Sequence, residues 1–197
     1  GCREAAALGF DAVELFVAPL ELPDPGDVRA ALWKWGLDLA AVGTGAGALV
    51  MNLSLCSARP TVRRTARVVL ERMVDWAAEL GAPAILGSMK GSVEPGVTLA
   101  DTEARLADSV RLLAGRASRH GQVLLVEPLN RYETNLMHTL DDGVGFVRRF
   151  GLENVRLLAD SFHMNIEEAD ARDALDRCLP YVGHVHLADS NRRAPGF

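Results

Sequence analysis

Acidic and imidazole side chains follow three successive apolar segments in the C-terminal half of the chain. Glu127 ends the first segment, Asp160 ends the second, and the third carries His184 and His186. Two carboxylates and an imidazole suit one divalent ion of the Mn, Mg, Co or Zn kind, and the oxygen ligands favour the harder ions. Side chains alternate along a strand, so the two histidines share a face. His186 is nearer the C-terminal end and is the better ligand candidate, with His184 as a deeper packing residue.

Each of these residues also has a purely structural interpretation. Glu127 precedes a proline and could pair with Arg131, Asp160 could cap the turn after it, and histidines in strands are often satisfied core residues. Taken singly, each residue fits the structural interpretation better. Together they favour a site, because unpaired charges are costly to bury at the mouth of a folded sheet.

The segments that must position these residues alternate between strands and helices. Apolar runs predict strands at 10–17, 37–42, 83–87, 123–127, 155–160 and 181–187. Helical spacing and capping residues predict helices at 24–36, 60–81, 101–120, 139–150 and 167–178, after a helix end at 1–9. The stretches 43–57 and 88–99 are expected to be loops. This alternation implies right-handed strand–helix–strand units and a parallel sheet.

A barrel explains this pattern better than a doubly wound sheet. The first strand ends in FVAP at 16–19, without the glycine-rich phosphate loop of a dinucleotide-binding sheet. We therefore expect an α/β protein with an incomplete (β/α)8 TIM-barrel fold, with about six of the eight strands in this sequence. Residues 1–197 would form a single domain that lacks the first strand and the last strand–helix unit. In such a barrel, neighbouring strand ends converge on one rim, which brings Glu127, Asp160 and His186 together.

The composition limits the partners and the compartment. The formal net charge is −5 without basic runs, which argues against nucleic acid or an anionic membrane as the main partner. No apolar run is long enough to cross a membrane, and the three scattered cysteines suggest neither disulfides nor a zinc cluster. We therefore expect a cytoplasmic protein. Trp33, Trp35 and Trp76 fit packing or a subunit interface, and we expect a homo-oligomer, either a dimer or a tetramer.

Three motifs resemble those of a known enzyme family. They are EPLNRYETN at 127–135, DSFHMNIEE at 160–168 and GHVHLADSNR at 183–192. Their order and spacing resemble those of the motifs in the sugar isomerase/epimerase family, which is the group of xylose isomerase-like TIM barrels. Within this family the resemblance is greatest to the D-tagatose and D-psicose 3-epimerases. The resemblance is strongest over 122–196. Before that, only the strand–helix rhythm and short pieces such as GFDAVEL at 9–15 match.

The resemblance implies roles for six residues. The metal ligands would be Glu127, Asp160 and His186, and the residues that bind the ketose oxygens would be Glu133, His163 and Arg192. The metal, Mn²⁺ before Mg²⁺, Co²⁺ or Zn²⁺, would polarise a carbonyl and acidify the neighbouring C–H group. Glu127 would exchange that proton through a cis-enediolate intermediate, so it is the catalytic residue. The substrate would be a free or simple sugar.

The chain differs from the family at several positions. The family's fourth metal ligand, a glutamate that is also the second acid/base, has no counterpart before Phe197. We therefore expect the chain as given to be catalytically incomplete and its parent protein to be complete. His138 replaces an asparagine and could face a sugar phosphate at a helix N-terminus, although a solvent-facing residue is the commoner case. Lys90 is expected to be a solvated charge, in a loop that helps to shape substrate choice. Arg193 beside Arg192 leaves two arginines as candidates for one position.

Several activities fit this constellation. The leading hypothesis is a metal-dependent ketose 3-epimerase or aldose–ketose isomerase. An inosose-type dehydratase or a hydroxypyruvate-type isomerase of the same fold would be the runner-up. An apurinic-site endonuclease is more remote. That activity needs several histidines at the rim and a basic surface, whereas this chain has five histidines in all and a net charge of −5. A non-catalytic sugar-binding barrel is the remaining alternative.

Overall fold

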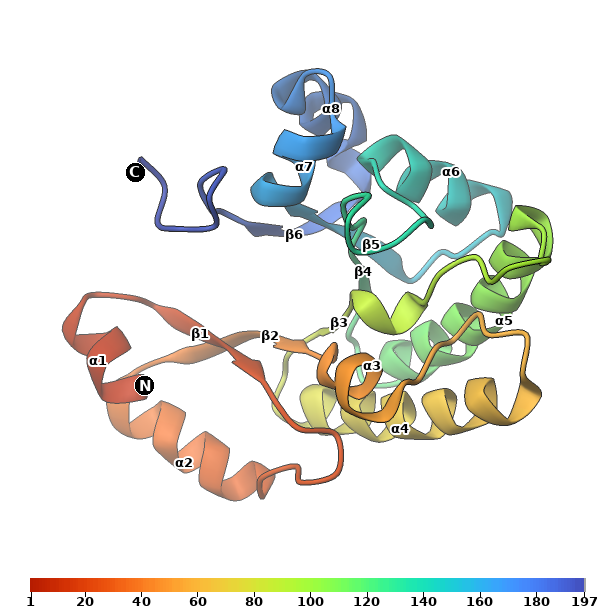
Figure 1. The fold of residues 1–197 in the computed structure, drawn as a ribbon. Helices are drawn as coiled ribbons and strands as arrows, with labels where there is room; N and C mark the ends of the chain where they lie inside the picture. The colour runs from red at the N-terminus through yellow and green to blue at the C-terminus, as the bar shows by residue number, and fades with distance from the viewer. Residues whose placement is uncertain (197) are drawn as a thin grey trace.

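The computed structural model describes residues 1–196 as a curled sheet of six parallel strands with helices along its outer face (Figure 1). The strands are β1 (Ala12–Phe16), β2 (Asp38–Gly43), β3 (Ala84–Leu86), β4 (Leu124–Val126), β5 (Val155–Asp160) and β6 (Val182–His186). They pair in chain order, every neighbouring pair is parallel, and β1 and β6 are the edges. This order and curvature confirm the prediction of a barrel-type α/β fold.

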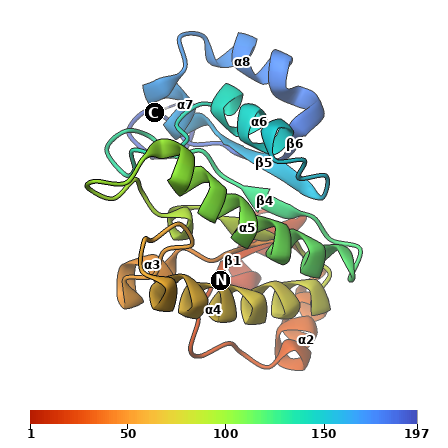
Figure 2. The same cartoon turned by 90° about the vertical axis from the view of Figure 1, so that its right-hand side faces the viewer.

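Helices connect the strands and cover the convex face of the sheet. They are α1 (Cys2–Ala7), α2 (Pro25–Trp35), α3 (Ala46–Met51), α4 (Pro60–Glu79), α5 (Leu99–Ser118), α6 (Leu140–Arg149), α7 (Ser161–Glu167) and α8 (Ala171–Cys178). Two turns of 3-10 helix are η1 (Ser88–Lys90) and η2 (Leu179–Tyr181). Figure 2 shows α4 and α5 side by side in front of the strands. Within residues 1–196, no helix combines the length and the apolar character needed to cross a lipid bilayer.

Both segments expected as loops contain helical turns. The segment 43–57 includes α3, which has no capping side chain and packs on η1. Tertiary packing therefore decides its structure, against a glycine-rich sequence that favours a loop. The loop expected at 88–99 includes η1. The prediction that Asp101 caps the next helix is wrong, because the Thr98 hydroxyl accepts a hydrogen bond from the Asp101 N–H and α5 starts two residues earlier.

The helix predicted at 167–178 begins later, at Ala171, and an unpredicted helix, α7, precedes it at Ser161–Glu167. Asp160, the last residue of β5, accepts a hydrogen bond from the Phe162 N–H at 2.8 Å and starts α7 at once. Asp170 accepts a hydrogen bond from the Asp173 N–H at 2.9 Å and starts α8. Two aspartate caps therefore break this segment without a glycine or a proline to mark the break.

Strand alternation divides the apolar side chains into two layers. The larger layer lies between the sheet and the helices. The smaller layer lies on the concave face and consists of Ala41, Ile85, Leu125 and Leu158. Two positions further along the same strands, on the same face, come Gly43, Gly87, Glu127 and Asp160. An apolar floor thus supports a polar rim at the carboxyl ends of the strands.

The three tryptophans lie on α2 and α4. Trp76 is buried, and its Nε1 donates a hydrogen bond to the Pro23 carbonyl at 2.7 Å. Trp33 is 87% exposed and Trp35 is 36% exposed. Packing therefore explains Trp76, and the homo-oligomer stays a prediction.

Candidate active site

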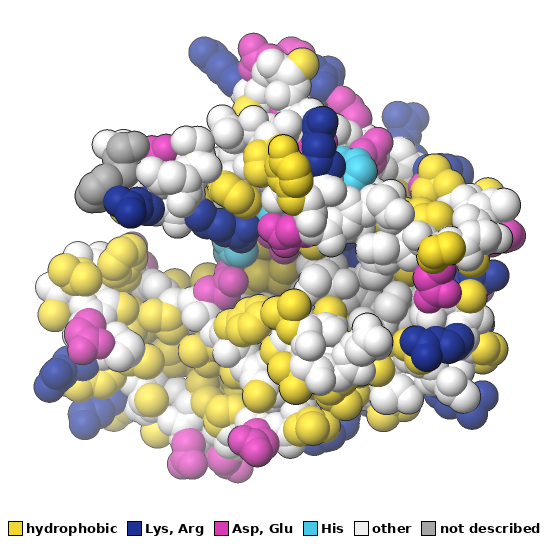
Figure 3. All heavy atoms as spheres, in the orientation of Figure 1, with side chains coloured by type: hydrophobic (Ala, Val, Ile, Leu, Met, Phe, Trp, Pro, Cys, Tyr) yellow, Lys and Arg dark blue, Asp and Glu magenta, His cyan; other side chains and the backbone are white. Residues whose placement is uncertain are grey.

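The carboxyl ends of the strands surround a cavity of about 220 Å³. It lies in the cleft seen in Figure 3, where acidic, basic and histidine side chains gather between the upper and lower parts of the molecule. Five of the six predicted site residues line this cavity: Glu127, Glu133, His163, His186 and Arg192. The sixth, Asp160, lies within 3.9 Å of His163. The fold therefore brings all six residues together.

Two carboxylates face two imidazole rings at the centre of the site. Glu127 Oε1 lies 3.7 Å from His163 Nε2 and 4.0 Å from His186 Nδ1. Asp160 Oδ2 lies 3.9 Å from His163 Nε2 and 3.6 Å from His186 Nδ1. Glu127, Asp160 and His163 each offer one ligand atom, and these atoms all lie within 4.8 Å of one another. Carboxylate oxygens with an imidazole nitrogen form a donor set that fits a divalent cation.

Burial affects the two carboxylates differently. Glu127 is 9% exposed, and burial raises the pKa of its carboxyl to about 7, with the positive charge of Lys90 opposing the rise. Burial also acts to raise the pKa of Asp160, but His186 and the Phe162 N–H outweigh it and hold this pKa below its ordinary value. A carboxyl that titrates near neutral pH can take up and release a proton, whereas its neighbour stays ionised.

The hydrogen bonds of His163 identify its protonated nitrogen. The Asn130 N–H donates to His163 Nδ1 at 3.2 Å, and Asn130 Nδ2 lies 2.7 Å from the same atom. Because Nδ1 accepts, the neutral ring carries its proton on Nε2. Burial lowers the pKa of His163, which favours this neutral form. His163 therefore turns an N–H group toward Glu127 and Asp160, which suits a hydrogen bond to a substrate oxygen better than metal ligation.

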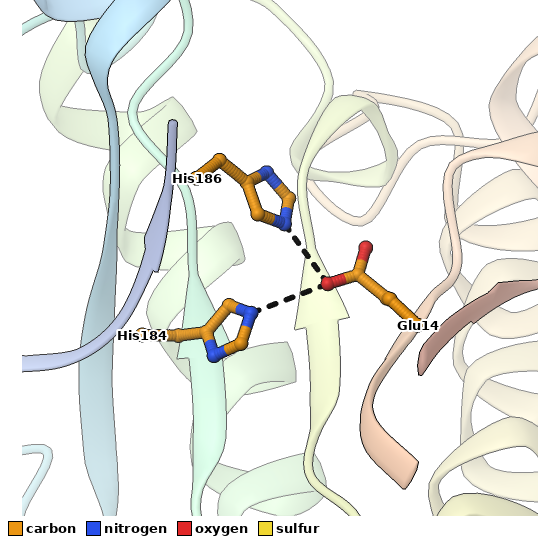
Figure 4. Close-up of side chains that lie close together, drawn as sticks. All are labelled: Glu14, His184 and His186. Carbon is orange, nitrogen blue, oxygen red and sulfur yellow. Dashed lines mark hydrogen bonds and ion pairs between the residues drawn. The ribbon is translucent and has the colours of Figure 1, made fainter. Parts of the chain in front are cut away.

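His186 has the opposite arrangement. Its Nε2 lies 2.9 Å from a carboxylate oxygen of Glu14 (Figure 4), and its Nδ1 faces Asp160 and Glu127. A carboxylate only accepts hydrogen bonds, so Nε2 is the donor. Asp160 and Glu14 raise the pKa of His186 to about 10, so both nitrogens of this ring carry a proton near neutral pH. Of the two rings, His186 is the one that can turn a lone pair toward both carboxylates.

Arg192 reaches the cavity from the chain after β6. Its guanidinium lies 3.5 Å from Asp160 Oδ2 and 3.5 Å from Glu133 Oε1, and it stacks over the Phe162 ring at 4.5 Å from the centroid. The half-exposed Glu133 also accepts a hydrogen bond from Asn130 Nδ2 at 3.1 Å. Arg192 and Glu133 thus place a donor and an acceptor side by side at the cavity wall.

Lys90 is buried, which contradicts the expectation of a solvated charge. It is 1% exposed, and its ammonium donates to the Glu127 carbonyl at 2.5 Å and to the Gly87 carbonyl at 3.2 Å. Burial lowers the pKa of Lys90 to about 8. Lys90 therefore joins the carboxyl ends of β3 and β4 directly behind Glu127, through acceptors that no sequence motif reveals.

Gly87 and Glu14 are the other site residues that sequence reasoning missed. A Cβ atom on Gly87 would lie 2.8 Å from Glu127 Oε2, so a larger residue there would push this carboxylate from its position. Glu14 reaches the site from the first strand. Its one signal in the sequence is a charge in an otherwise apolar strand, and the lack of a side chain at Gly87 gives no signal.

Two alternative interpretations fail on specific contacts. Arg131 pairs with Glu167 at 2.9 Å, so it does not account for Glu127. The backbone N–H of His138 donates to the Asp142 carboxylate at 2.9 Å, and this carboxylate already occupies the N-terminus of α6. A second anion there would meet a like charge, so nothing at His138 supports a sugar phosphate site.

The chain is similar in sequence to proteins of known activity. A protein-family model described as xylose isomerase-like TIM barrel matches residues 2–196. The chain is 32% identical over 199 residues to a D-psicose 3-epimerase of Agrobacterium fabrum, an alignment covering 98% of this chain and 68% of the relative. It is 30% identical over 202 residues to a 3-dehydro-D-guloside 4-epimerase of Escherichia coli, covering 98% of this chain and 75% of the relative.

Solved structures give the same result. A 3-keto-D-glucoside 4-epimerase from Escherichia coli superposes with a TM-score of 0.87 at 27% identity, covering 99% of this chain and 75% of that chain. A D-psicose 3-epimerase determined in the presence of D-fructose has a TM-score of 0.84 at 30% identity, covering 99% and 68%. A family 2 AP endonuclease from Brucella melitensis has a TM-score of 0.80 at 22% identity, which supports the fold alone. The resemblance seen in the three motifs is thereby confirmed.

Proposed function

The chain belongs to the xylose isomerase-like TIM-barrel family, and from this premise we propose that it is a metal-dependent ketose 3-epimerase. The curated relatives make it an enzyme of the isomerase class. The observation that carries the finer proposal is the meeting of Glu127, Asp160 and His186 at one rim, with His163 and Arg192 beside them.

Glu127, Asp160 and His186 would hold the divalent ion. Their oxygen-rich donor set favours a hard ion, Mn²⁺ or Mg²⁺, over a soft one. When bound, such an ion would polarise a carbonyl oxygen and stabilise the negative charge that follows proton removal. His163 stays outside the ligand set in this proposal, because its Nδ1 accepts the Asn130 N–H and its Nε2 carries the proton.

Glu127 would move the proton. In the metal-free site burial raises the pKa of its carboxyl to about 7, and a buried carboxylate at the cavity wall is a suitable group to take a proton from the carbon beside the carbonyl and return one. Asp160 keeps its charge and does not compete as a base, because its pKa lies below the ordinary value. Glu127 would therefore act as the base, and Asp160 would remain a fixed negative charge.

Three residues would hold the sugar in place. The His163 Nε2–H and the Arg192 guanidinium can donate hydrogen bonds to sugar oxygens, and the Glu133 carboxylate can accept one from a hydroxyl. Arg192 is itself fixed by stacking on Phe162, which limits the freedom that binding must remove.

Inversion also needs a proton on the opposite face of the carbon. The proposal therefore includes a second carboxylate facing Glu127 across the cavity. Inversion at C4 of a keto sugar is the second candidate reaction, because a 4-epimerase matches this chain about as well as the 3-epimerases do.

Exchange with solvent tests the proposal. Full-length protein loaded with Mn²⁺ is incubated with a panel of ketoses in D₂O, and products are followed by NMR. The proposal predicts deuterium at C3 together with the C3 epimer, and neither with Glu127→Gln. Deuterium at C4 would favour the second candidate. Loss of a hydroxyl would indicate a dehydratase, and metal-loaded protein that exchanges no substrate carbon would contradict the proposal.

A further inference from the structure

A carboxylate from the first strand of the sheet meets two histidines from the last strand. Glu14 Oε2 lies 2.9 Å from His186 Nε2 and 3.2 Å from His184 Nε2 (Figure 4). β1 and β6 are the two edges of the sheet, so these contacts join segments that do not pair through their backbones. The three side chains keep between 21% and 31% exposure, so they are half-buried inside the curl.

The layers of the sheet explain how Glu14 reaches His186. Glu14 pairs in register with Ala41, and His184 pairs with Leu158, so both lie beside the apolar inner layer. His186 lies two residues further along β6, at the rim with its register partner Asp160. Glu14 therefore approaches the rim from one layer below, on the side of the ring that faces away from Asp160.

The geometry constrains which ring nitrogen carries hydrogen. Glu14 can only accept, so the Nε2 atoms of both histidines donate to it. With hydrogen on Nε2, a neutral His186 ring has its lone pair on Nδ1.

We propose that Glu14 is a positioning residue that fixes the tautomer and the ring orientation of His186, so that Nδ1 is presented to a divalent ion beside Glu127 and Asp160. This inference rests on the metal site of the proposed function. His184 acts in support, because its bond to the same oxygen holds the Glu14 carboxylate in place. Partners of this kind orient an imidazole ligand and raise its basicity.

Metal affinity of the full protein tests this role without measuring turnover. Co²⁺ is titrated into wild type, Glu14→Gln and Glu14→Ala, with binding followed by calorimetry and by the visible absorption of the ion. Loss of an orienting partner weakens metal binding by about 10- to 100-fold in known sites, and we expect that range for both variants. We also expect the absorption bands to shift, because the imidazole then approaches the ion at another angle.

Two further variants separate positioning from general damage. Glu21→Gln changes an exposed glutamate on the loop that follows the same strand and should keep wild-type affinity and spectrum. Glu14→Asp retains the acceptor on a shorter arm and should recover part of the affinity. Thermal melting of each variant without metal identifies any that fail to fold.

The outcomes distinguish this inference from the function on which it rests. Wild type that binds no divalent ion would contradict the metal site itself, and this inference with it. Wild type that binds the ion while Glu14→Gln and Glu14→Ala keep the same affinity and spectrum would contradict the role of Glu14 alone. Weaker binding with an altered spectrum in both folded variants is the result the inference predicts.

Discussion

The two halves of the curled sheet contribute to the cavity in opposite ways. Strands β4 to β6 contribute the functional side chains, which come in three motifs close to their carboxyl ends. Strands β1 to β3 contribute mainly space, through Gly43 and Gly87, together with one carboxylate, Glu14. A motif search finds the first kind of contribution, because it consists of side chains. The second kind consists of missing side chains and of contacts between distant segments.

The glycines show how tightly the space is defined. A Cβ atom on Gly43 would lie 2.6 Å from the Phe16 ring, and one on Gly87 would lie 2.8 Å from Glu127 Oε2. The first half therefore fixes where Phe16 and Glu127 can lie, although it contributes few polar atoms. Substitutions in each half can test whether activity depends as strongly on the space around Glu127 as on the functional side chains themselves.

The largest effect is expected in the second half of the sheet, at Glu127. Glu127→Gln removes the proposed base and one charged ligand, and it should lower kcat/KM for epimerisation by about 10³-fold or more, since a positioned base contributes about 10²- to 10⁴-fold. Glu133→Gln is the matched control. It alters a half-exposed carboxylate at the cavity wall and should act mainly through KM. Equal losses in the two variants would contradict the division of roles.

Gly87→Ala tests the first half. The added methyl group must displace the Glu127 carboxylate, and a misplaced catalytic group can cost about 10²-fold in rate. Gly145→Ala is the control, because its Cβ meets nothing within 4 Å on α6 and it should stabilise the helix by about 0.5–1 kcal/mol. If Gly87→Ala had the turnover of the wild type, the room that Gly87 leaves for the Glu127 carboxylate would not be important for activity.

Lys90→Met tests the residue that links the two halves behind the site. It leaves the Glu127 carbonyl without this buried donor, whereas the Gly87 carbonyl keeps the Lys90 backbone N–H, and losing such a partner costs about 1–3 kcal/mol. Urea unfolding should report a lower free energy of unfolding for Lys90→Met than for Lys34→Met, which changes an exposed lysine on α2. A stability equal to that of the control would mean that this ammonium contributes no net stabilisation.

The smallest effect is a pH dependence of metal binding. In the metal-free site near neutral pH, His186, with its pKa raised to about 10, is protonated, and Glu127, with its pKa raised to about 7, is protonated in part of the molecules. Protons and metal compete for these atoms, so the apparent affinity for Mn²⁺ should rise with pH, by about tenfold or less per pH unit for each proton released. Calorimetry in buffers of different ionisation enthalpy measures the released protons. Binding that weakens as the pH rises would contradict this assignment.

The sequence predicted the elements that follow simple periodicity. All six strands and the barrel-type order are confirmed, as are the family and the isomerase class. The start of the helix predicted at 167–178 was wrong because Asp170 caps it and α7 ends at Glu167. The loop expected at 43–57 was wrong because α3 depends on packing against η1. Local patterns carry no information about such tertiary packing. The sugar, the metal, the oligomer and the compartment stay predictions.

The site was predictable where residues close in sequence act together. His163 lies three positions after Asp160, and the predicted site residues do meet. Lys90 was misjudged because its partners are backbone carbonyls at two strand ends. Glu14 was overlooked because its nearest partners lie 170 and 172 positions away. Contacts of that range appear only once the sheet has curled.

The central claim is that His186, and not His163, completes the metal site with Glu127 and Asp160. Anomalous diffraction from a crystal soaked in Mn²⁺ tests it most directly. We expect one strong peak bonded to carboxylate oxygens of Glu127 and Asp160 and to Nδ1 of His186, with Nε2 of His163 outside the coordination sphere. A peak bonded to His163 Nε2 in place of His186, or no peak between the two carboxylates, would contradict it.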